Sequence, residues 1–260
     1  MDKQTQEVFY YPNLGQSLGL VIRLLLIGIP FFFIRKILET DNPLWNSLTL
    51  MLTYVCGTAI IVLFGIRRMR KLNKDGYSLK FKRVNIWSLL IMTLMMVSVF
   101  IIASAIAELI PMTPETEQYY KTMFQPNIFF FILGVFVAPV IEEILYRGII
   151  LEGMLNNYTP AKSIIWSAVF FGAAHLNPWQ GISALLTGLL IGWVYWKTNS
   201  LIPCIILHCS NNLIGVIMMS APAFKLFDYK ILLLTLLCSA SIVLIVGYML
   251  LNKKLASNSP

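Results

Sequence analysis

The sequence predicts an all-α polytopic membrane protein, a bundle of about eight transmembrane helices around an intramembrane polar cavity. Of its 260 residues, 58% are hydrophobic and only 12% are charged, and the mean hydropathy is +0.75. Soluble domains carry about a quarter charged residues, so a soluble enzyme, a disordered chain and a disulfide-stapled secreted domain are excluded. The apolar residues form long runs without strand-like alternation or a fixed repeat, which indicates helices that cross a membrane.

Eight apolar runs are candidate spans, because a transmembrane helix needs about 20 residues. They lie at 16–38, 44–66, 84–110, 127–147, 161–176, 180–197, 200–221 and 230–252. The fifth and sixth runs are short, so we expect one of them to be tilted, partly submerged or broken. The first run is predicted to be a retained helix and not a cleaved signal peptide. The expected organisation is an N-terminal tail, N-terminal spans, core spans and a last span with its tail, at 1–15, 16–126, 127–221 and 222–260.

The net charge of +8 is concentrated in one loop, at 67–83. Its eight basic residues are Arg67, Arg68, Arg70, Lys71, Lys74, Lys80, Lys82 and Arg83. Because short basic loops stay in the cytoplasm, we predict a multi-pass protein of the cell membrane with this loop and both termini inside. Pro111–Pro126 is then the largest external loop. The basic charges also favour anionic headgroups, so membrane lipids are expected partners and nucleic acid is not.

Ionisable side chains inside membrane spans are costly and usually face a bundle interior or a water-filled cavity. Here they gather on three runs: Glu142, Glu143 and Arg147 on the fourth, His175 on the fifth, and His208 with Asn211 and Asn212 on the seventh. The chain has only two histidines, and both lie in apolar helices. A carboxylate, two imidazoles and an amide together form a set of groups suited to hydrolysis.

Three pairs of these residues are four positions apart and therefore share a helix face: Glu143 with Arg147, His208 with Asn212, and Phe171 with His175. We interpret the first pair as a buried ion pair that fixes its helix, and the second as two polar groups side by side. In the third pair, the ring is expected to pack beside the imidazole. Glu142 is rotated by about 100° from Glu143 and can point toward the bundle centre. Taken singly, each of these groups also fits a purely structural role.

The depth of these groups in the membrane predicts where the fourth helix ends. If it stopped at Arg147, the helical rise would leave Glu142 and His175 ~12–13 Å apart in depth. We therefore predict that the helix continues to about Met154, because Gly153 and the following Asn-Asn pair are better stop signals.

Three segments resemble the motifs of a known family. They are EEILYR (142–147), FGAAH (171–175) and HCSNN (208–212), which look like EExxxR, FxxxH and HxxxN. These motifs are those of the CPBP intramembrane proteases, which include the type II CAAX prenyl endopeptidases and bacteriocin-processing or immunity proteins. The resemblance covers roughly residues 125–220.

The resemblance implies a role for each matching residue. Glu142 and His175 would activate the attacking water, His208 and Asn212 would stabilise the oxyanion, and Glu143 and Arg147 would support the site. The implied activity is that of an intramembrane endopeptidase acting on a membrane-associated or lipidated substrate. Water and peptide are expected to enter from the cytoplasmic side or laterally between helices.

Two questions remain open at this point. On the favoured interpretation no cofactor is required, but Glu142, His175 and His208 could instead supply a His₂Glu set for zinc or another divalent metal. The HExxH signature is absent, and Asn212 fits an oxyanion donor better than a zinc ligand. Two other classes compete with the enzyme: a non-catalytic bacteriocin-immunity or scaffold protein, and a proton-coupled transporter. The transporter is disfavoured because the sequence shows no paired broken helices or half-to-half repeat.

Overall fold

The computed structural model describes residues 10–73, 76–116, 118, 127–220 and 230–256, and its secondary structure over these residues is entirely helical. The elements are α1 (Leu14–Ile37), α2 (Pro43–Leu72), α3 (Ile86–Glu108), α5 (Ile128–Ile132), η1 (Leu133–Val137), α6 (Ala138–Glu143), η2 (Ile144–Leu151), α7 (Glu152–Leu155), α8 (Pro160–Ala173), α9 (Pro178–Thr198), α10 (Leu201–Ser220) and α11 (Lys230–Ala256). The predicted all-α membrane fold is confirmed.

Several helices begin where the sequence supplies a capping side chain. A capping side chain accepts a hydrogen bond from a backbone N–H that has no partner within the helix. The caps of α1, α2, α3, α5, α8 and α9 are Asn13, Asn42, Asn85, Asn127, Thr159 and Asn177. A proline opens the first turn of α2, α8 and α9, a position where the missing N–H costs nothing.

Among the described residues, six helical stretches are long and apolar enough to cross a membrane. They are α1, α2, α3, the continuous helix Ile128–Leu155, Leu201–Met218 of α10 and Leu233–Lys254 of α11. The protein is therefore a multi-pass membrane protein. The other two predicted spans correspond to α8 and α9. With 14 residues, α8 is only ~21 Å long, shorter than the ~30 Å hydrocarbon core, and α9 has sufficient length but is less apolar.

The helix that carries the glutamates continues well past Arg147, as predicted. It runs without a break from Ile128 to Leu155, and Asn156 and Asn157 close it by donating side-chain N–H groups to the carbonyl oxygens of the preceding turn. Two stretches of it, η1 and η2, are π-helical. Such stretches are rare and often occur at functional sites, and η2 begins directly after Glu143.

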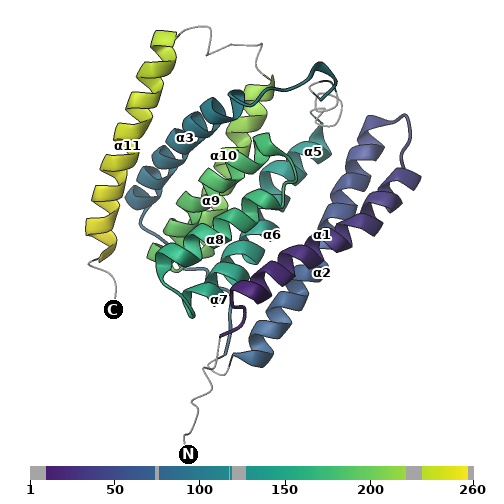
Figure 1. Ribbon diagram of the computed structural model, residues 1–260, viewed down its shortest axis with the longest axis horizontal. Helices are drawn as coiled ribbons and strands as arrows, with labels where there is room; N and C mark the ends of the chain where they lie inside the picture. Colours follow the sequence, from purple (N-terminus) through teal and green to yellow (C-terminus); the bar gives the residue numbers. More distant parts are fainter. Residues whose placement is uncertain (1–9, 74–75, 117, 119–126, 221–229, 257–260) are drawn as a thin grey trace, which may run out of the picture.

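The described helices lie side by side, with the glutamate-bearing helix near the centre (Figure 1). The α1–α2 hairpin forms one edge of the bundle, and α11 forms the other, where it packs against α3. Between them, α9 contacts α3, α8 and α10. The α8–α9 contact is close: a Cβ on Gly172 would lie 2.7 Å from the carbonyl oxygen of Gly181.

The interior of the bundle is apolar at the end beside the basic loop. Buried side chains of the N-terminal part of α1, the C-terminal part of α2 and η2 form one apolar cluster there, which includes Leu20, Met69 and Ile150. Tyr77, in the segment between α2 and α3, contacts η2 at this end. Its hydroxyl donates a 2.6 Å hydrogen bond to the Gly148 carbonyl oxygen. Burial raises the pKa of the Tyr77 phenol, so this group remains a donor.

Some predicted regions lie outside the described residues: the N-terminal tail before residue 10, residues 117 and 119–126 of the external loop, and the tail after residue 256. The boundaries between the four expected regions and the cytoplasmic placement of the termini stay predictions.

Candidate active site

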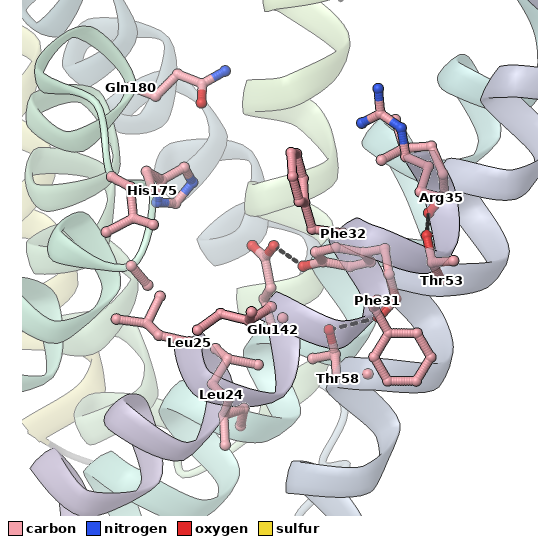
Figure 2. Close-up of a pocket in the computed structure, with 18 of the residues that line it drawn as sticks. Leu24, Leu25, Phe31, Phe32, Arg35, Thr53, Thr58, Glu142, His175 and Gln180 are labelled. Carbon is pink, nitrogen blue, oxygen red and sulfur yellow. Dashed lines mark hydrogen bonds between the residues drawn. The ribbon is translucent and has the colours of Figure 1, made fainter. Parts of the chain in front are cut away.

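An apolar cavity of about 740 Å³ lies between the α1–α2 hairpin and the ends of α8 and α9. Its lining is mostly aliphatic and aromatic, with Phe31 and Phe32 of α1 among its larger side chains. Glu142 and His175 both lie on its wall, and Figure 2 shows them facing the same space. The structure therefore brings together the two residues that were predicted to activate water.

The cavity extends away from the basic loop. Its lining runs from Leu24 in the middle of α1 to Arg35 near the α1 C-terminus, and includes Gln180 in the first turn of α9. The apolar cluster at the basic end lies in the opposite direction. The expectation that water and peptide enter from the cytoplasmic side or laterally between helices stays a prediction. The cavity is compatible with lateral access.

Glu143 forms a fully buried network behind the cavity. Its Oε1 accepts a 3.0 Å hydrogen bond from Arg147 Nη1 and a 2.8 Å hydrogen bond from His208 Nδ1. The Glu143 and Arg147 side chains are both 0% exposed, and Arg147 Nη2 also donates to the Gly188 carbonyl oxygen at 3.3 Å. The predicted ion pair is thus present, and it also holds one of the two histidines.

This network sets the orientation of the His208 ring. Because Glu143 offers an acceptor, Nδ1 carries a proton, which leaves Nε2 3.7 Å from Glu142 Oε2. His208 can donate a hydrogen bond from Nε2 only when both ring nitrogens are protonated.

His175 lies in the turn that follows α8, where its Nδ1 is 2.9 Å from the Phe171 carbonyl oxygen. A carbonyl can only accept, so Nδ1 carries a proton, and in the neutral form of the ring Nε2 has a lone pair. The imidazole packs edge-on against the Phe171 ring, with centroids 5.1 Å apart, as the spacing predicted. The hydrogen bond and the ring contact together hold the imidazole on the wall of the cavity.

Phe171 contacts several members of the site at once. Its ring centroid lies 5.5 Å from that of His208 and 4.8 Å from the Arg147 guanidinium carbon. The guanidinium over the ring is a cation–π contact, which is stronger where water is excluded. The ring, 1% exposed, therefore connects the two histidines to the buried ion pair.

Asn212 is hydrogen-bonded to neighbouring residues and does not line the cavity. Its Nδ2 donates to the Gly134 carbonyl oxygen on η1 at 2.8 Å, and its Oδ1 is 3.3 Å from Asn211 Nδ2. Neither His208 nor Asn212 lines the cavity on which Glu142 and His175 lie. The structure thus brings His208 beside Glu142, one layer behind the cavity wall, and holds Asn212 one helical turn further along α10.

Sequence reasoning missed Tyr54 of α2, whose hydroxyl donates a hydrogen bond to Glu142 Oε1. The sequence signal that could have identified Tyr54 is its position within a predicted span. Tyr54 lies eleven residues after Pro43, which places it ~17 Å along the helix, near the middle of a hydrocarbon core of ~30 Å. A tyrosine hydroxyl at that depth needs a hydrogen-bond partner.

The alternative metal-ligand set, Glu142 with His175 and His208, is not assembled in the described residues. Over the part of the chain that the structure describes, no three His, Cys, Asp or Glu side chains lie close enough together to hold one metal ion. Glu142 and His208 approach to 3.7 Å, whereas His175 faces the cavity from the end of α8. These residues as arranged do not fit a zinc site, and we derive no step through a metal.

The segment that carries all three motifs was compared with protein families. Residues 124–214 match a family described as type II CAAX prenyl endopeptidase Rce1-like. We call residues 124–214 the Rce1-like segment because of this similarity. The resemblance drawn from the motifs is therefore confirmed, and the Rce1-like segment contains Glu142, His175, His208 and Asn212 but not Tyr54.

Relatives were also found among curated proteins. The UPF0177 protein YxdF of Lactococcus lactis is 34% identical over 102 residues, 38% of this chain and 55% of its own length. An uncharacterized protein of Mycoplasma capricolum is 21% identical over 83% of this chain and 70% of its own. An uncharacterized 24.3 kDa protein of Escherichia coli is 26% identical over 50% and 62%. The match with the first relative spans about half of that relative's length. No solved structure matches this chain.

Proposed function

We propose that the protein is an intramembrane endopeptidase that hydrolyses a peptide bond in a membrane-associated or lipidated substrate. The observation that carries this proposal is that Glu142 and His175 face one apolar cavity inside the membrane bundle (Figure 2). Such a cavity favours an apolar peptide segment or a lipid chain. The Rce1-like match of residues 124–214 supports the same class of reaction.

In the proposed reaction, a water in the cavity attacks the carbonyl carbon of the scissile bond. Its proton passes to Glu142 Oε2 or to His175 Nε2, the two acceptors that the surrounding hydrogen bonds leave available. The carbon–nitrogen bond then breaks, and the leaving amine takes up that proton. A general base must be held in a fixed position to act in this way, and the hydrogen bonds of both residues supply that.

His208 and Asn212 are proposed to stabilise the oxyanion. Neither side chain lines the cavity in this structure, so this role requires the scissile carbonyl to pass between Glu142 and α10 when the substrate binds. With both ring nitrogens protonated, His208 would donate from Nε2, next to Glu142. The Asn212 amide has a second N–H beside the one that Gly134 accepts, and this N–H would donate to the substrate oxygen. Loss of one oxyanion donor costs about 2.7–4 kcal/mol of transition-state stabilisation in other enzymes.

The proposal is tested by reconstituting the purified protein in liposomes with a set of membrane-spanning and lipidated peptides. Glu142→Gln and His175→Ala should abolish cleavage while leaving insertion and unfolding temperature unchanged. Glu39→Gln is the matched control and should cleave normally. Glu39 lies in the turn after α1 and forms an exposed ion pair with Lys36. Full cleavage by both site variants would refute the assigned roles.

The same assay addresses the metal alternative. Activity that survives a chelator supports water activation by the side chains alone. Activity that a chelator removes and a divalent ion restores would support a ligand role for Glu142, His175 and His208, together with a rearrangement that gathers them.

A further inference from the structure

Tyr54 contacts the proposed catalytic carboxylate from outside the Rce1-like segment. It lies on α2, 88 positions before Glu142, and its hydroxyl donates to Glu142 Oε1. Its side chain also belongs to the wall of the cavity. The site residues singled out from the motifs are on α6, η2 and α10 and in the turn after α8, so Tyr54 is a contribution from a different part of the bundle.

The hydrogen bond distinguishes the two oxygens of the carboxylate. Oε1 is occupied by Tyr54, while Oε2 lies 3.7 Å from His208 Nε2. A glutamate side chain has three rotatable bonds and is costly to hold in one conformation. With Oε1 held, Oε2 is the oxygen that remains to accept a proton from water in the cavity.

The position of Tyr54 is itself determined by close packing of α2. A Cβ on Gly65 of α2 would lie 2.9 Å from Ile149 Cδ1 on η2, so these two helices approach each other closely. Helix α2 also contacts α5 and α6. Tyr54 is thus carried by a helix packed along the glutamate-bearing helix and not by a mobile loop.

We infer that Tyr54 is a positioning residue that holds the Glu142 carboxylate for proton transfer. The functional unit then includes α2, and the Rce1-like segment is incomplete without it. This inference rests on the proposed function. It adds no covalent step, because the phenol keeps its proton throughout the reaction.

The experiment compares Tyr54→Phe with Tyr195→Phe in the full chain reconstituted in liposomes, measuring kcat, KM and unfolding temperature. Tyr195 is a matched control, because its hydroxyl also donates to a glutamate, Glu152 Oε2 at 2.9 Å, but it does not line the cavity. Each substitution removes one oxygen atom and one Tyr–Glu hydrogen bond. We expect kcat of Tyr54→Phe to fall by about 10- to 100-fold with KM nearly unchanged, since misplacement of a reacting group by ~1 Å can cost that much. Tyr195→Phe should keep its kcat.

The possible outcomes separate the inference from the proposed function. If Glu142→Gln is inactive and Tyr54→Phe keeps its kcat, the inference is overturned and the proposed function stands. If Glu142→Gln is fully active, both the inference and the proposed function are overturned. A rise in KM with unchanged kcat would make Tyr54 a substrate contact and also overturn the inference. Should Tyr54→Phe fail to fold, Tyr54→Met, which is apolar, flexible and without a donor, is judged by the same kcat criterion.

Discussion

His208 donates from Nδ1 to Glu143 Oε1 over 2.8 Å, and this bond joins α10 to the helix that carries both glutamates. The same oxygen accepts from Arg147. Glu143 therefore has two functions: it neutralises a buried guanidinium and fixes the orientation of an imidazole beside Glu142. A hydrogen bond from one ring nitrogen to a carboxylate also sets the direction in which the other ring nitrogen points.

Replacing Glu143 by alanine should destabilise the fold strongly. The substitution leaves the Arg147 guanidinium buried without its carboxylate, and breaking a buried pair in this way costs about 3–5 kcal/mol. The measurement is the free energy of unfolding in detergent micelles. Glu39→Ala, which removes an exposed partner of Lys36, is the control and should unfold like the unchanged protein. Equal stability of the two variants would show that Arg147 finds another partner.

Phe171→Leu should impair catalysis more than its neighbour Phe170→Leu. Phe171 contacts both histidines and Arg147, whereas Phe170 packs against Trp166. The two phenylalanines are 1% and 5% exposed, so the packing loss should be similar. Without the ring the imidazoles can shift, and we expect kcat to fall roughly tenfold or more in Phe171→Leu. Comparable kcat values in the two variants would contradict a role for the ring in orienting the site.

Filling the cavity should block the substrate without disturbing the catalytic groups. Gly28 of α1 lines the cavity, and a Cβ there would meet no atom within 4 Å. Gly28→Phe is expected to lower kcat/KM roughly tenfold or more by steric exclusion, whereas Gly28→Ala should cleave normally. Steady-state cleavage of a membrane peptide measures both. Normal cleavage by Gly28→Phe would show that the substrate reaches Glu142 by another route.

The orientation of the bundle decides which leaflet the cavity faces. We predict that the loop at 67–83 is cytoplasmic, so the α1–α2 turn lies outside and the cavity opens toward the outer half of the membrane. In a variant lacking the natural cysteines, a membrane-impermeant maleimide should label Asp41→Cys in intact cells. Ser78→Cys, within the basic loop, should react only after permeabilisation. The reverse labelling pattern would invert the predicted topology.

Sequence patterns determined the membrane class, the approximate positions of the helices and the residues of the candidate site. These features are local: apolar runs define spans, and a spacing of four places Glu143 with Arg147 and Phe171 with His175. The end of the glutamate-bearing helix was also predictable, because the Asn-Asn pair after Leu155 can close it.

Only the tertiary structure decided which groups meet across helices. The bond from Tyr54 to Glu142, the bond from His208 to Glu143, and the apolar cluster at the basic end all join segments far apart in the chain. No periodicity within one helix encodes the relative depth and rotation of two helices, because these are set by side-chain packing between them. For the same reason, the few ionisable residues within the apolar runs could predict a polar site in the membrane, but not the side of the bundle on which its cavity opens.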